Sequence, residues 1–110
     1  MTNDVSEEQG RLVVKLNGEV DLENAGDVRK TLLDCIARKR DVLVDLSGVT
    51  YIDSSGIASL VEGLQTARKN GTGLSLVAVS VRAMRVLALA RLDKVFQIHP
   101  DLATALQSGS

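Results

Sequence analysis

Aromatic residues, cysteine and proline are nearly absent from this 110-residue chain, which has one Phe, one Tyr, no Trp, one Cys and one Pro. Its hydrophobic core must therefore be built from Leu, Val, Ile and Ala. The chain lacks the aromatic platform on which single-stranded nucleic acid is stacked. One cysteine cannot form an internal disulfide, and no Cys/His cluster has metal-ligand spacing, so we expect neither a zinc site nor any other metal or cofactor.

A surplus of one charge sign is also missing. Thirteen basic residues face fourteen acidic ones, for a net charge of -1, and no basic patch is present that would neutralise a phosphate backbone, which argues against nucleic acid as a partner. No apolar run approaches the roughly 20 residues that span a bilayer, and the N-terminus is polar, so we expect no membrane insertion and a cytoplasmic protein.

What the chain does contain is an alternation of strand and helix patterns. Apolar and β-branched runs predict strands at residues 5–8, 11–16, 42–46, 74–79 and 95–98. Helical spacing predicts helices near residues 25–36, 55–69, 81–90 and 101–106, the last opened by Pro100 at its first position. This order favours one α/β domain over residues 1–110 (core about 5–106, tail 107–110 disordered), with a small, mixed, mostly parallel β-sheet covered by about four helices.

The junction Asp53-Ser54-Ser55-Gly56, between a buried strand and the second helix, carries the clearest functional signal. Asp53 or Ser54 is expected to cap the helix. Capping needs only one of the polar residues, so folding alone does not explain Ser55, and the first turn of a helix favours added negative charge. A catalytic serine would need a base. The only histidine, His99, has no acidic or Cys partner nearby in sequence, so we expect no enzyme.

Two helix faces leave alternatives open. Ser55, Ala58, Ser59 and Glu62 share one face of the second helix, and small residues there serve either a partner or the close approach of another helix. The third predicted helix is apolar almost all round. That excess indicates burial under the last helix, or else contact with a partner or in a homodimer.

Three segments together resemble the STAS domains, and especially the bacterial anti-sigma-factor antagonists. They are Leu16-Asn17-Gly18-Glu19-Val20-Asp21 with Asn24-Ala25, Val44-Asp45-Leu46-Ser47-Gly48-Val49, and Tyr51-Ile52-Asp53-Ser54-Ser55-Gly56-Ile57-Ala58. The resemblance implies a domain that binds an anti-sigma factor with serine-kinase activity and releases it when a serine at the start of the second helix is phosphorylated, until a serine phosphatase restores binding.

By the same resemblance the phosphoacceptor is Ser55, with Ser54 as second choice. The partner-binding surface is then expected to comprise Glu19, Asp21, Asn24, Asp53, Ser54, Ser55, Gly56, Ala58, Ser59 and Glu62. STAS subunits of lipid-transport ABC complexes carry a close motif, often with Thr. An accessory subunit that binds an ATPase is therefore the alternative.

Overall fold

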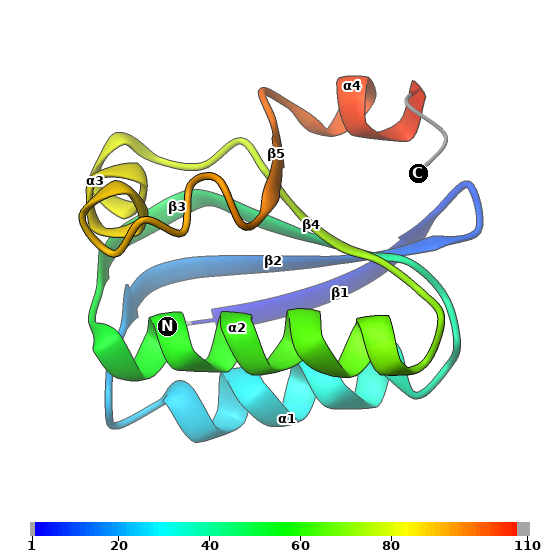
Figure 1. The fold of residues 1–110 in the computed structure, drawn as a ribbon, viewed down its shortest axis with the longest axis horizontal. Coiled ribbons are helices and arrows are strands. Elements are labelled where there is room, and N and C mark those ends of the chain that lie inside the picture. The colour runs from blue at the N-terminus through cyan, green and yellow to red at the C-terminus, as the bar shows by residue number, and fades with distance from the viewer. Residues whose placement is uncertain (1, 108–110) are drawn as a thin grey trace.

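In the computed structural model, residues 2–107 are described, with side chains from residue 4 onward. Five strands form one sheet in the order β1-β2-β3-β4-β5 (Figure 1). β1 pairs antiparallel with β2, and every other pair is parallel. The predicted mixed, mostly parallel sheet is therefore confirmed. The strands are β1 (Thr2–Glu8), β2 (Arg11–Val20), β3 (Val42–Ile52), β4 (Leu74–Val77) and β5 (Gln97–His99).

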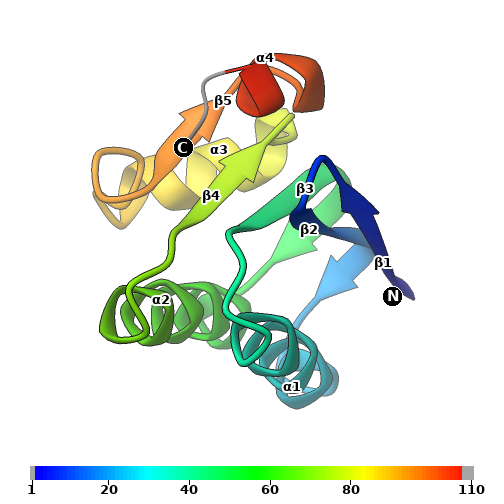
Figure 2. The same cartoon turned by 90° about the vertical axis from the view of Figure 1, so that its right-hand side faces the viewer.

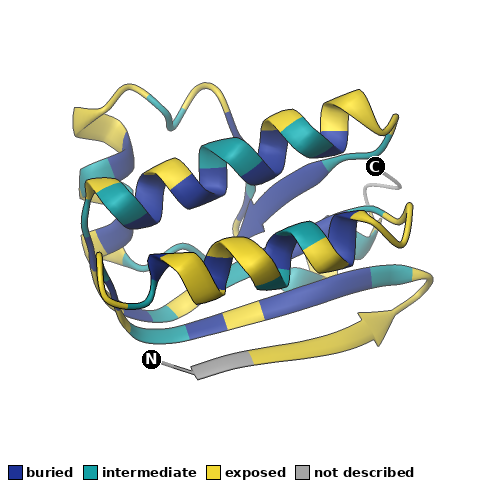
Figure 3. Ribbon diagram, turned by 90° about the horizontal axis from the view of Figure 1, so that it is seen from below, coloured by how far each residue is buried: buried dark blue, intermediate teal, exposed yellow. Residues whose placement is uncertain are grey.

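Four helices cover the sheet: α1 (Ala25–Ile36), α2 (Ser54–Lys69), α3 (Val81–Leu89) and α4 (Leu102–Gln107). α1 and α2 lie side by side on one face, and α4 lies on the other (Figure 2). Each of the two long helices turns a buried stripe to the sheet and an exposed stripe outward (Figure 3). The apolar residues of α1 that recur at three- and four-residue intervals are all buried: Ala25, Val28, Leu32, Cys35 and Ile36. None of the helices described is long and apolar enough to cross a membrane.

The spacing of the inward-facing residues differs between β2 and β3. In β2 the main core takes every second residue, as in Leu12, Val14 and Leu16, but β3 has two register shifts against β2. The offset between paired residues grows from Lys15 with Asp45 to Glu19 with Tyr51. β3 therefore carries two more residues than β2 over this stretch, in the manner of β-bulges.

Several predicted boundaries are wrong. The first three strands are longer than predicted, since β1 begins at Thr2, β2 continues to Val20 and β3 continues to Ile52. β4 ends at Val77 instead of residue 79 because Ala78 takes a positive φ of 50°. β5 begins at Gln97 because the backbone amides of Val95 and Phe96 both donate to the carbonyl of Leu92, which holds them in a turn.

The last helix also begins later than predicted, at Leu102. The Asp101 carboxylate accepts a hydrogen bond from the Thr104 amide (2.7 Å), so Asp101 caps the helix and Pro100 lies outside it. That bond lowers the pKa of Asp101. Gln107, predicted as tail, belongs to α4, and residues 108–110 lie outside the described part of the chain.

The third helix is not buried under the last one. α4 packs Ala105 against Val13, Leu43 and Val77 on the opposite face of the sheet, whereas only Ala83 and Leu87 of α3 are buried. His99 is only 8% exposed at the end of β5, and its Nε2 has no hydrogen-bond partner among the described residues.

Candidate functional site

Asp53 joins the start of α2 to the loop after β2. As the N-cap residue, its Oδ1 accepts a hydrogen bond from the Gly56 amide (3.0 Å), and its Oδ2 accepts one from the Leu22 amide (3.1 Å). The predicted cap is therefore confirmed at Asp53. Because both oxygens are used, one carboxylate fixes the position of the α2 terminus relative to the β2–α1 loop.

The β2–α1 loop is held by its own polar side chains. Asn24 accepts from the Asp21 amide (3.0 Å) and donates to the Glu19 carbonyl (2.9 Å). The Asp21 carboxylate accepts from the Glu23 amide (3.1 Å). Asp21 and Asn24 thus shape the loop, while Glu19 and Leu22 are exposed.

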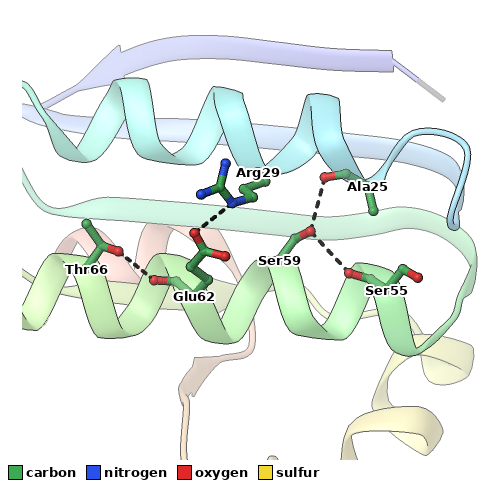
Figure 4. A network of polar contacts seen from close by, with 6 residues as sticks. All are labelled: Ala25, Arg29, Ser55, Ser59, Glu62 and Thr66. Atoms are coloured by element: carbon green, nitrogen blue, oxygen red, sulfur yellow. Dashed lines mark hydrogen bonds and ion pairs between the residues drawn. The ribbon is translucent and has the colours of Figure 1, made fainter.

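Ser54 and Ser55 are the first two residues of α2. Ser54 is exposed and Ser55 is partly buried. The Ser55 hydroxyl points away from Ser59 and from α1, toward the end of the helix (Figure 4). A group attached to this oxygen would project beside the Asp53 cap.

The face of α2 that includes Ser59 is a helix–helix contact. Ser59 is only 6% exposed, and its hydroxyl lies 3.1 Å from the carbonyl oxygens of both Ala25 and Ser55 (Figure 4). Gly63 packs near Leu32 of α1. Of the two alternatives for this face, the close approach of α1 therefore applies at Ser59, whose side chain is not exposed to a partner.

Gly56 and Glu62 have similar structural explanations. Gly56 is buried, and a Cβ there would lie 2.7 Å from Ile52 Cγ1 and 2.8 Å from Val20 Cγ1. Glu62 pairs with Arg29 of α1 at 2.6 Å (Figure 4). Of the predicted α2 positions, Ser54 and Ala58 are exposed, and Ser55 and Glu62 are partly so, with Glu62 engaged by Arg29. The accessible site is therefore the first turn of α2 together with the loop.

Charge is unevenly distributed around this turn. From residue 17 to residue 28 the chain has four acidic residues and no basic one; they are Glu19, Asp21, Glu23 and Asp27. The Asp53 carboxylate adds to them. The loop and the turn together present a negative rim around Ser54 and Ser55.

Two exposed hydrophobic residues near this rim escaped the sequence prediction. Leu22 is 78% exposed in the loop that Asp53 holds, and Tyr51 is exposed on β3 beside Glu19, its partner in the strand register. Leu22 could have been recognised as an apolar residue within an acidic loop. Tyr51 could not, because the register shifts decide which way it faces.

The site is a surface at one end of α2, and a hollow lies at the other end. This hollow, of about 410 Å³, is lined by residues that include Arg68, Thr72, Ser75, Val95 and Gln97. Among the described residues, no three His, Cys, Asp or Glu side chains are grouped so that they could hold a metal ion. Cys35 is buried, and burial raises the pKa of its thiol, as expected for a core residue rather than a nucleophile.

Comparison with known proteins identifies the class of this fold. The family model for the STAS domain matches residues 3–105, and the chain belongs to that family. Among curated proteins it is 27% identical to the anti-sigma-B factor antagonist of Bacillus subtilis over 95 residues, which cover 86% of this chain and 87% of that one.

Solved structures agree with this assignment. An anti-sigma factor antagonist from Mycobacterium paratuberculosis superposes with a TM-score of 0.89 at 30% identity, over 97% of this chain and 92% of that one. The unphosphorylated anti-sigma factor antagonist SpoIIAA has a TM-score of 0.84 over 97% of this chain and 95% of its own. At 14% identity, that likeness concerns the fold alone.

Proposed function

We propose that this chain is a single STAS domain that acts as an anti-sigma-factor antagonist, by binding an anti-sigma factor rather than by catalysis. The names of its relatives support this function. The observation that carries the proposal is the Asp53 clamp, which holds an accessible serine and an exposed loop in one fixed surface. A preformed surface of this type suits protein binding because little ordering is needed on association.

Phosphorylation of Ser55 is the proposed switch. A phosphoserine carries close to two negative charges, and in the first turn of a helix it is compatible with the macrodipole. The helix should therefore stay folded. The same charge, added to a rim that already contains Asp53, Asp21 and Glu19, would have to be desolvated against a neutral partner surface with no opposite charge to compensate it, and this cost would weaken binding.

Ser55 is preferred over Ser54 because of the family resemblance, and the geometry is compatible with it. The Ser55 hydroxyl is free to project from α2, while Ser54 is exposed on the same turn. Both serines are therefore mapped separately in the test. The proposed modifying partners are the anti-sigma factor acting as serine kinase and a serine phosphatase, and the proposed compartment is the cytoplasm, where transcription is controlled.

The test uses an anti-sigma factor with a kinase domain from the same genome, purified and mixed with the protein. With ATP we expect phosphate on Ser55 and loss of the complex. Ser55→Ala should stay bound with ATP present, and Ser55→Asp should lose affinity while keeping the thermal midpoint of the unmodified protein. Ser54→Ala is the matched control and should remain switchable.

Equal binding by Ser55→Ala, Ser55→Asp and the unmodified protein would contradict the switch. Co-purification with a transporter ATPase, together with a Ser55 that stays unmodified across growth conditions, would instead favour the accessory-subunit alternative.

A further inference from the structure

The outward face of α3 has the composition of a contact surface. Val81 is 70% exposed and Leu89 is 86% exposed, and both lie on one line with Arg85 at four-residue spacing. Ala88 and Arg82 flank this line and are exposed too. Only Ala83 and Leu87, on the far side of the helix, are buried, so the exposed apolar side chains contribute nothing visible to the core.

The charge on this face is of one sign. From Ser80 to Leu92 the chain has three arginines, Arg82, Arg85 and Arg91, and no acidic residue. All three are exposed, and none forms an ion pair with another described residue. The face therefore combines apolar contact area with uncompensated positive charge.

This face lies at the same end of the molecule as the phosphoacceptor turn. Ser80, the N-cap of α3, donates from its hydroxyl to the Val49 carbonyl (2.8 Å), three residues before β3 ends at Ile52. Figure 1 and Figure 4 both show α3 on the same side of the molecule as the end of α2 that carries Ser54 and Ser55. The acidic loop from residue 17 to 28 and the basic helix α3 thus both belong to this end.

We propose that the α3 face, made by Val81, Arg82, Arg85, Ala88 and Leu89, is a second docking surface for the partner protein and takes an acidic amphipathic helix. The inference rests on the proposed function, which supplies the partner. Leu and other apolar residues of that helix would cover Val81 and Leu89, and its Glu or Asp residues would pair with Arg82 and Arg85.

Charge complementarity specifies this occupant. In a two-fold symmetric dimer through this face, a second copy of this chain would offer α3 another basic face, which would be repelled. The partner must then offer a neutral region to the Asp53 rim and an acidic helix to α3. Such an arrangement fixes the orientation of the complex, since reversal would place like charges together.

The first experiment uses a probe peptide of about 15 residues, long enough to form helix, with Leu at helical spacing and Glu on both flanks. Titration into the isotope-labelled protein should shift the amide signals of α3, and binding should weaken as salt is raised. A peptide with Lys in place of Glu is the control and should not bind. No shift in α3, or equal binding of the Lys peptide, would overturn the proposal.

The variant pair Arg82→Glu with Arg85→Glu should lower the affinity for the Glu peptide and for the anti-sigma factor about tenfold, because two attractive pairs become repulsive. Arg68→Glu with Lys69→Glu makes the same charge change on exposed residues at the far end of α2 and should leave both affinities unchanged. Equal losses of affinity in the two double variants would indicate a general charge effect and overturn the proposal.

Failure of this inference can be told from failure of the proposed function. If Ser55 variants switch binding as expected but the α3 reversal has no effect, only the second surface is refuted. If the Ser55 variants bind the anti-sigma factor like the unmodified protein and the Glu peptide still binds α3, the phosphoswitch is refuted and the docking surface on α3 is supported. Binding of anionic phosphatidylglycerol vesicles through α3, without binding of the peptide, would overturn the inference in favour of a membrane surface.

Discussion

The carboxylate of Asp53 and the amide of Leu22 meet at 3.1 Å, although the two residues are 31 positions apart in sequence. The other oxygen of the same carboxylate caps α2. One side chain therefore fixes both parts of the proposed binding surface, the helix that carries Ser55 and the acidic loop.

Two substitutions of Asp53 distinguish its role as the α2 cap from its role in holding the loop. Asp53→Ala removes both bonds and should lower the free energy of unfolding by about 1–2 kcal/mol. Asp53→Asn keeps one acceptor for the cap but loses the bond to Leu22, so most stability should remain while amide exchange in the loop increases. Urea denaturation and hydrogen exchange measure the two effects. Equal exchange in the Asn variant and the unmodified protein would contradict the clamp.

The close packing of Ile52 and Val20 around position 56 leaves room only for glycine. Gly56→Ala should destabilise the protein by about 1–3 kcal/mol, because the new Cβ would overlap Ile52 and Val20. Gly26→Ala is the matched control within α1, where no neighbour lies within 4 Å, and it should be neutral or stabilising by up to about 1 kcal/mol. Thermal or urea unfolding distinguishes them, and similar midpoints for the two variants would show that the turn has more room.

The ion pair between Arg29 and Glu62 should matter little for stability. Both side chains remain partly exposed, so solvent screens the attraction. A double-mutant cycle with Arg29→Ala and Glu62→Ala should give a coupling energy of about 0–1 kcal/mol. A larger coupling energy would mean that the packing of α1 against α2 depends on this ion pair rather than on the small residues Ser59 and Gly63.

Cys35 predicts a dependence of stability on alkaline pH. Burial raises the pKa of the folded thiol above its ordinary value of 9.0, so the folded state holds this proton more tightly than the unfolded state. The resulting stabilisation is fully present below pH 9 and is lost as pH rises through the folded pKa. The stability difference between the unmodified protein and Cys35→Ala should therefore shrink between pH 8 and pH 10 in urea titrations. A constant difference would refute the burial effect.

Much of the architecture was predictable because it depends on local patterns. The apolar spacing from Ala25 to Ile36 and the cap at Asp53 are encoded within a few neighbouring residues, and both are confirmed. The C-terminal stop of α2 is another case, since Asn70 caps the helix and Gly71 has a φ of 76°. Family resemblance then extended these local predictions to the correct fold.

The errors concern features that one helix or strand cannot specify alone. For Ser59 the sequence left a partner and another helix as alternatives, because its helical position is compatible with both and only the packing of two helices decides between them. For α3 it left burial under the last helix and contact with a partner as alternatives, and the first is wrong because α4 covers the opposite face of the sheet. The late start of β5 depends on the turn closed at Leu92.

The two register shifts in β3 determine where the Asp53 junction lies relative to β2. The side chains of a strand alternate between faces, and each bulge gives β3 one residue without a counterpart in β2, so the residues beyond it keep the face of their partners. Val49, after the first shift, and Ile52, after the second, both lie in the core. Deletion of the extra residue at one shift should therefore move the Asp53 junction back by one position relative to Val20. The serines beyond Asp53 would then no longer lie in their present place beside the β2–α1 loop.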